Sequence, residues 1–125
     1  NDVDQSDFVI GLGITDTTPL DTTDGIFFIS ADGDAGLDFL IEKDNSATTT
    51  EDVATMVDDT FITVAWYVDP NTSLVYYSIN HAEPVGVANT NVPDDEELTV
   101  SFGIQNGEAA AQTMTIDYVT AMVER

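Results

Sequence analysis

The stretch LVYYSINHAEPVGVA, residues 74–88, decides the fold of this chain. Its first residues alternate between two stripes, which is the period-two pattern of a β-strand with one buried face. A polar turn at Asn80 and His81 follows, and then a second alternating run begins. The stretch therefore predicts a β-hairpin, with Tyr76 on its outward side. The bulkier stripe is expected to face the core and consists of Val75, Tyr77 and Ile79.

The same alternation recurs along the chain, and no segment has a convincing helical period. Turn clusters rich in Gly, Asn, Asp and Pro separate the alternating runs. Residues 51–59 are ambiguous, and we interpret them as a short strand. Seven or eight strands spaced in this way predict an all-β fold, an antiparallel jelly-roll β-sandwich. The further predicted strands are 8–15, 25–30, 37–43, 60–68, 98–104 and 113–123.

The apolar stripes of three of these runs predict part of the core. Alternate side chains of a strand lie on the same face, so each stripe should point inward as a set. The residues expected inside are Phe8, Ile10, Leu12, Leu98, Val100, Phe102, Ile104, Ile116 and Tyr118.

Composition restricts the classes of partner. The chain has 125 residues, 24 of them acidic and only two basic, Lys43 and Arg125, which gives a formal net charge of -22. A surface this negative repels phosphate backbones and anionic lipids, so we expect no nucleic-acid and no membrane partner. Self-repulsion on this scale fits a salty medium or a basic, cation-rich partner. Without cysteine, disulfides and thiolate chemistry are excluded.

Two quoted segments resemble a known fold family. VDDTFITVAW and LVYYSINHAEPVG are similar to the laminin-G or concanavalin A-like jelly roll, with Phe61 in place of a Trp and His81 in place of a Gly, while Tyr77 and Asn80 match. TMTIDYVTAMVER resembles the closing strand of that fold. The resemblance covers roughly residues 53–123. It implies one domain over residues 1–125, with an N-terminal strand of the fold lost, trimmed or supplied elsewhere.

A narrower resemblance suggests a function. The region from PDDEELTVSFGIQNG to MTIDYV is similar to small structural proteins of marine tailed phages, which decorate or cement capsids. It implies a non-catalytic virion protein on the capsid surface. The expected partners are the major capsid protein or other virion proteins, with the chain present in many copies or as a homo-oligomer. No cofactor apart from calcium is expected.

Catalysis is the first alternative, because the resembled family includes glycoside hydrolases. A retaining enzyme of that kind needs two carboxyl groups about 5–5.5 Å apart. The predicted strands offer only Asp117 on one run, and Asp38 and Glu42 on an outward face. We therefore expect no enzyme activity. His81, the single histidine, is interpreted as an exposed turn residue in left-handed backbone, with a metal or pH-sensing role as the alternative.

Two binding sites remain candidates. Asp32, Asp34 and Asp38 surround two glycines in DGDAGLD and could hold calcium, although solvated turn aspartates are the competing interpretation. Exposed aromatic rings could bind a glycan, because neighbours such as Trp66 and Tyr67 face opposite ways on a strand. The alternative function is thus a lectin-like carbohydrate-binding module, calcium-dependent if the aspartates bind. Its candidate contact residues are Tyr76, Trp66 and His81.

Overall fold

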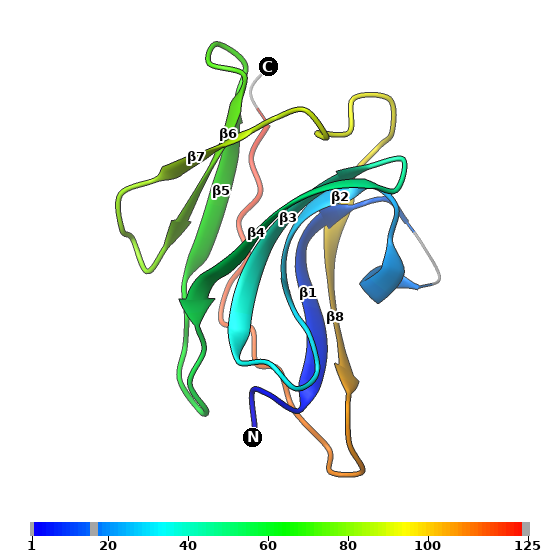
Figure 1. Cartoon of the computed structure of the whole chain (residues 1–125), viewed down its shortest axis with the longest axis vertical. Helices are drawn as coiled ribbons and strands as arrows, with labels where there is room; N and C mark the ends of the chain where they lie inside the picture. Colours follow the sequence, from blue (N-terminus) through cyan, green and yellow to red (C-terminus); the bar gives the residue numbers. More distant parts are fainter. Residues whose placement is uncertain (1, 16–17, 124–125) are drawn as a thin grey trace.

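The computed structural model describes residues 2–15 and 18–123 and consists of two antiparallel sheets (Figure 1). A five-stranded sheet has the order β4-β3-β2-β1-β8, and a three-stranded sheet has the order β5-β6-β7. The predicted all-β sandwich is confirmed, while its jelly-roll topology stays a prediction. The elements are β1 (Ser6–Gly13), the 3-10 helix η1 (Pro19–Asp21), β2 (Gly25–Ser30), β3 (Gly36–Lys43), β4 (Ser46–Thr55), β5 (Val64–Asp69), β6 (Leu74–Ile79), β7 (Val85–Ala88) and β8 (Thr99–Asn106).

The predicted hairpin is confirmed as β6 and β7. Tyr77 lies opposite Val85 and Val75 lies opposite Val87 in an antiparallel ladder. Val75 and Tyr77 are buried, and Tyr76 lies on the other side of the strand. The turn begins at Asn80 and His81, which both have positive φ angles, 50° and 62°. Asn and His tolerate this left-handed region better than most residues, so the sequence suits the turn.

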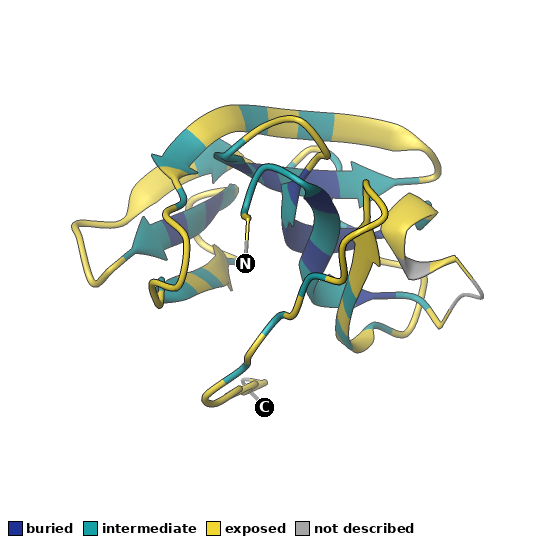
Figure 2. Ribbon diagram, turned by 90° about the horizontal axis from the view of Figure 1, so that it is seen from below, coloured by how far each residue is buried: buried dark blue, intermediate teal, exposed yellow. Residues whose placement is uncertain are grey.

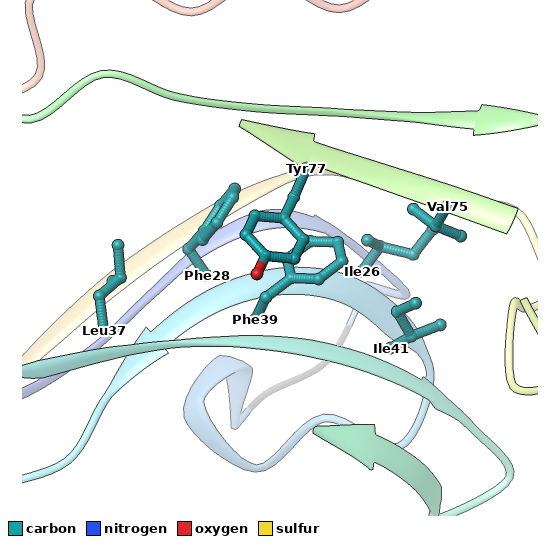
Figure 3. Packing of buried hydrophobic residues seen from close by; sticks show 7 residues of the cluster. All are labelled: Ile26, Phe28, Leu37, Phe39, Ile41, Val75 and Tyr77. Atoms are coloured by element: carbon teal, nitrogen blue, oxygen red, sulfur yellow. The ribbon is translucent and has the colours of Figure 1, made fainter. Parts of the chain in front are cut away.

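The core lies between the two sheets, and three aromatic rings form its centre (Figure 3). Phe39 from β3 packs between Phe28 and Tyr77, with ring centroids 5.0 Å from each. Phe28 meets Tyr77 edge-on at 6.5 Å, one of the arrangements that aromatic pairs prefer. Tyr77 therefore joins the small sheet to the large one. The buried cluster consists of Ile26, Phe28, Leu37, Phe39, Ile41, Val75 and Tyr77.

A second buried ring lies on the opposite face of the large sheet. Phe27 neighbours Phe28 in β2, so its side chain points away from the main core, yet it is fully buried. Its ring lies over Gly11, Gly13 and Gly25: a Cβ atom on Gly25 would come within 2.1 Å of it. The glycines of β1 and β2 therefore leave the space that this ring occupies.

The predicted inward stripes of β1 and β8 are on the expected face but are not all buried. Ile10 lies opposite Phe28 on one side and Phe102 on the other, so all three share the face that carries the core. Phe8 packs against the core, but Val100, Phe102 and Ile104 are exposed. The expectation that these three β8 residues are core is wrong. The residues of the buried cluster come from β2, β3 and β6, and none comes from β8. In Figure 2 the buried residues, drawn in dark blue, lie toward the middle of the molecule.

The predicted strand at residues 113–123 is also wrong. This segment is in neither sheet, and Tyr118 is exposed rather than in the core. Its burial nevertheless alternates at the start, with Met114 and Ile116 half-buried and Thr115 exposed. The segment is therefore in position to turn one face toward the protein. A strand requires a ladder of backbone hydrogen bonds to a neighbour, and residues 113–123 belong to neither sheet.

Candidate functional site

The clearest aromatic surface lies on the outward face of the three-stranded sheet. Tyr67 of β5 and Tyr76 of β6 are directly opposite each other in the ladder. Their rings are stacked, with centroids 5.1 Å apart and planes 16° from parallel. Tyr67 keeps 51% of its surface exposed. The pair therefore presents a pre-ordered aromatic surface to solvent.

The residues around this pair are small or apolar. Alternation and register place Ala65, Asp69, Leu74, Ser78, Gly86 and Ala88 on the same face as the two rings. Gly86 lies opposite Tyr76, and a Cβ atom on it would come within 3.1 Å of the Tyr76 ring. Because Gly86 has no side chain, the Tyr76 ring has room to lie flat against β7. We call these eight residues, with Tyr67 and Tyr76 at the centre, the tyrosine face.

Asp69 is the one charged residue among the strand positions of the tyrosine face, all of which the structure describes. Its carboxylate accepts hydrogen bonds from the backbone N–H of Asn71 at 2.8 Å and from the Asn71 side chain at 3.3 Å. The Asn71 backbone N–H bond, followed by a bond from the Thr72 side chain, lowers the pKa of Asp69. Asp69 is therefore ionised and bonded to its own turn, and it carries the single charge among the strand positions of the tyrosine face.

The structure separates the predicted contact residues Tyr76, Trp66 and His81. Trp66 points inward and packs against the core, because its neighbour Tyr67 takes the outward position. His81 is exposed in the turn beyond β6 and belongs to neither sheet. Sequence reasoning chose Tyr76 as a contact residue; it considered Tyr67 among the aromatic candidates but chose its neighbour Trp66 instead. Only the register between β5 and β6 identifies Tyr67, because it places Tyr67 directly opposite Tyr76. That register cannot be predicted unless the length of the β5–β6 turn is known.

The carboxylates of two of the predicted calcium ligands, Asp34 and Asp38, accept hydrogen bonds from separate parts of the backbone. Asp34 Oδ1 accepts the N–H of Gly36 at 2.7 Å, and Asp38 Oδ1 accepts the N–H of Asp52 at 2.8 Å. The N–H of Asp32 donates to Asp7 Oδ1 at 2.7 Å. Within residues 2–15 and 18–123, no three acidic or histidine side chains gather in a geometry that holds a metal. Calcium binding by these aspartates stays a prediction.

An acidic hollow lies at the opposite end of the large sheet from these loops. Five carboxylates line it, together with Ile14, Thr15 and Thr23; they belong to Asp24, Asp44, Asp95, Glu96 and Glu97. Asp24 is buried, and its carboxylate accepts hydrogen bonds from the Thr23 hydroxyl at 2.7 Å and the Asp44 N–H at 3.0 Å. Those bonds make Asp24 a structural residue of the loop connections.

The single lysine lies near this hollow. Lys43 forms ion pairs with Asp94 and with Asp95, the second at 3.2 Å. The hydrogen bond that Lys43 donates to Asp94, and then the one that it donates to Asp95, raises the pKa of Lys43. Its neighbour Glu42 has a raised pKa because burial disfavours the charged carboxylate and because Asp24 and Asp21 are close. Negative charge is therefore only partly compensated here.

The described residues also include no helix with the length and apolarity required to span a membrane.

Comparison with known proteins yields no relative: no family model, no curated protein and no solved structure matches the chain. The resemblances to concanavalin A-like domains and to phage capsid proteins therefore depend on the quoted motifs alone.

Proposed function

We propose that this chain is a non-catalytic structural protein of a virion, which decorates or cements the capsid of a tailed phage. The observation that carries the proposal is the tyrosine face. It places two stacked aromatic rings among small residues on the outside of a molecule with a net charge of -22. On such a molecule, the nearly uncharged aromatic surface is the part best suited to bury against a protein.

The composition of the tyrosine face is that of an interface centre. Tyrosine is enriched and charged residues are depleted in the buried centres of protein–protein interfaces. The surface area of the stacked Tyr67 and Tyr76 rings is small compared with that of a standard interface, which buries about 800 Å² per partner. A homo-oligomer would offset a small contact, because its linked copies would bind neighbouring positions of a repeating lattice at the same time. The proposed partner is accordingly the major capsid protein or another virion protein. For the fold itself, the proposed topology is a jelly roll.

The acidic remainder of the surface fits this role. Strong net charge keeps proteins and particles dispersed, and salt shortens the range of the repulsion between neighbouring copies. A decorating protein that turns its neutral face to the shell would turn its carboxylates to the medium. The proposed location is therefore the outer surface of the capsid.

The second candidate, a lectin-like glycan-binding module, is favoured by the same rings. The half-exposed face of Tyr67 could stack on the C–H face of a sugar, as aromatic side chains do at apolar surfaces with a polar rim. In this alternative, the carboxylates of Asp32, Asp34 and Asp38 would be the source of any calcium dependence.

One pair of variants tests the proposal. Tyr67→Ala removes the exposed ring of the tyrosine face, while Phe61→Ala removes a still more exposed ring outside it. Purified phage heads are mixed with each protein and sedimented. We expect the wild type and Phe61→Ala to sediment with the heads in many copies and Tyr67→Ala to stay in the supernatant. If no protein binds heads, but a glycan binds saturably and requires Tyr67, the alternative replaces the proposal.

A further inference from the structure

The inner face of β1 and β8 is an apolar surface that the small sheet leaves uncovered. Phe102 is 52% exposed although it shares this face with fully buried Phe28. No residue of β1 or β8 that points to this side between Phe8 and Leu12 or between Val100 and Ile104 is charged. We call this surface the open face; its residues are Ile10, Leu12, Val100, Phe102 and Ile104, and it is bordered by Phe8, which packs against the core.

An unpaired strand edge borders the small sheet. Among the residues that the structure describes, β5 pairs only with β6, so the other edge of β5 has no strand beside it and is open to a further one. Val68 of β5 shows the effect: it lies opposite fully buried Val75, yet it remains 38% exposed. A further strand beside β5 would therefore bury apolar surface as well as satisfy backbone groups.

Residues 113–123 have the properties of such a strand. The segment alternates along its length and carries one acidic side chain, Asp117, in a chain that has 24. Met114–Val123 form no hydrogen bond with another described residue. The exposed side chains of Met122 and Val123 are apolar, so the segment loses hydrophobic free energy as long as it stays undocked.

The start of the segment is already held at the end of the sandwich where β8 finishes, from which the segment can run back alongside the sheets. The N–H of Gln112 donates to Asn106 Oδ1 at 2.9 Å, and the N–H of Asp2 donates to Gln112 Oε1 at 2.9 Å. Gln112 is thus held where β8 ends, and from there the segment runs back along the length of the molecule (Figure 1). Figure 2 shows it as a separate, mostly exposed stretch of irregular backbone below the sheets.

We propose that residues 113–123 bind as an extended strand over the open face of their own chain, beside the free edge of β5, and so close the sandwich. The stripe of Met114, Ile116 and Tyr118 would contact the open face, since Met114 and Ile116 are already the half-buried side. The inference goes beyond the proposed function and does not use the tyrosine face.

The occupant is the segment of the same chain rather than that of a second copy. A tether as short as the 107–112 connection gives a local concentration in the millimolar range, which a free copy in dilute solution does not reach. Two copies with a net charge of -22 each also repel each other on approach. Both effects favour closure within one chain.

Hydrogen exchange followed by NMR tests the closure in the full chain. We expect the amides of residues 114–122 that meet a neighbour to exchange at least about 100-fold more slowly than in an unstructured peptide, independently of protein concentration. Ile116→Asp places a charge on the inward stripe and should abolish this protection. The matched control Thr115→Asp adds the same charge on the outward stripe and should keep it.

A thiol probe tests which surface is covered. The chain has no cysteine, so Val100→Cys gives a single, nearly isosteric thiol on the open face. A maleimide reagent should label it at least about 10-fold more slowly than it labels the Val100→Cys, Ile116→Asp double variant, while Thr115→Asp should leave the slow rate unchanged. Near-ultraviolet circular dichroism of the aromatic core verifies that each variant is folded.

Three results would overturn the inference. Unprotected amides throughout 114–122 would mean that the segment stays undocked. Protection together with rapid labelling at position 100 would mean that the segment pairs elsewhere. Protection that grows with protein concentration, in step with a dimer measured by light scattering, would mean that a second copy is the occupant.

Discussion

Phe102 and Phe28 lie on the same face of the large sheet, on either side of Ile10, yet Phe102 is 52% exposed and Phe28 is 1% exposed. The difference follows from what lies opposite each residue. Phe28 meets Tyr77 of the small sheet, whereas Phe102 belongs neither to the buried cluster nor to the half-buried residues packed against it. The stability of the sandwich is therefore concentrated in the half formed by β2, β3 and β6.

Replacing Tyr77 by Ala should destabilise the protein by about 3–5 kcal/mol, the range for large aromatic truncations in a core. Tyr77 is buried and contacts both Phe28 and Phe39, so its loss leaves a cavity between the sheets. Urea unfolding of wild type and variant measures the difference in their free energies of unfolding. Phe61→Ala is the exposed control and should cost less than about 1 kcal/mol. Equal losses in the two variants would mean that the core is not centred on Tyr77.

Replacing His81 by Gly should leave binding intact and keep or raise stability. His81 has a φ of 62°, and glycine adopts this region without the steric cost that a Cβ atom brings. The gain in the folded state is offset by the larger entropy of glycine in the unfolded chain, so we expect a change within about 1 kcal/mol. Thermal unfolding and head sedimentation measure the two properties. A loss of head or glycan binding would identify the turn as functional.

Replacing Glu42 by Gln should stabilise the protein at pH 7 but not at pH 4. Burial, and then Asp24 and Asp21, raises the pKa of Glu42 in the folded state above its usual value of 4.5. The folded state therefore binds the proton more tightly, and this contribution to stability is lost as the pH rises through the folded pKa. The uncharged amide avoids that loss. Melting temperatures of wild type and variant should diverge as the pH rises from 4 to 7; parallel curves would contradict the raised pKa.

Salt should stabilise the protein. Between about 0.05 M and about 1 M NaCl the Debye length falls from more than 10 Å to about 3 Å, which screens the repulsion among 24 acidic side chains. The melting temperature should rise over this range, even though salt weakens the exposed Lys43–Asp94 pair. A flat or falling curve would show that bound cations already neutralise the carboxylates, and a calcium titration would then identify that case.

Local sequence pattern predicted the parts of the fold that depend on local alternation. The hairpin at residues 74–88 could be predicted because a period-two stripe and a turn suited to positive φ occur together. The exposure of Phe102 could not be predicted in this way, because it depends on how many strands the opposite sheet has. The outward aromatic at Tyr76 was predictable from alternation. Its stacking partner Tyr67 required the register between two strands, which a turn of unknown geometry sets.

The most direct test of the proposed function is cryo-electron microscopy of heads purified from a phage that carries this chain. We expect two-sheet density at symmetry-related positions on the outer surface of the capsid, with the tyrosine face against the shell and the acidic hollow toward the solvent. Heads that lack this density, or density in which Tyr67 and Tyr76 point into solvent, would contradict it.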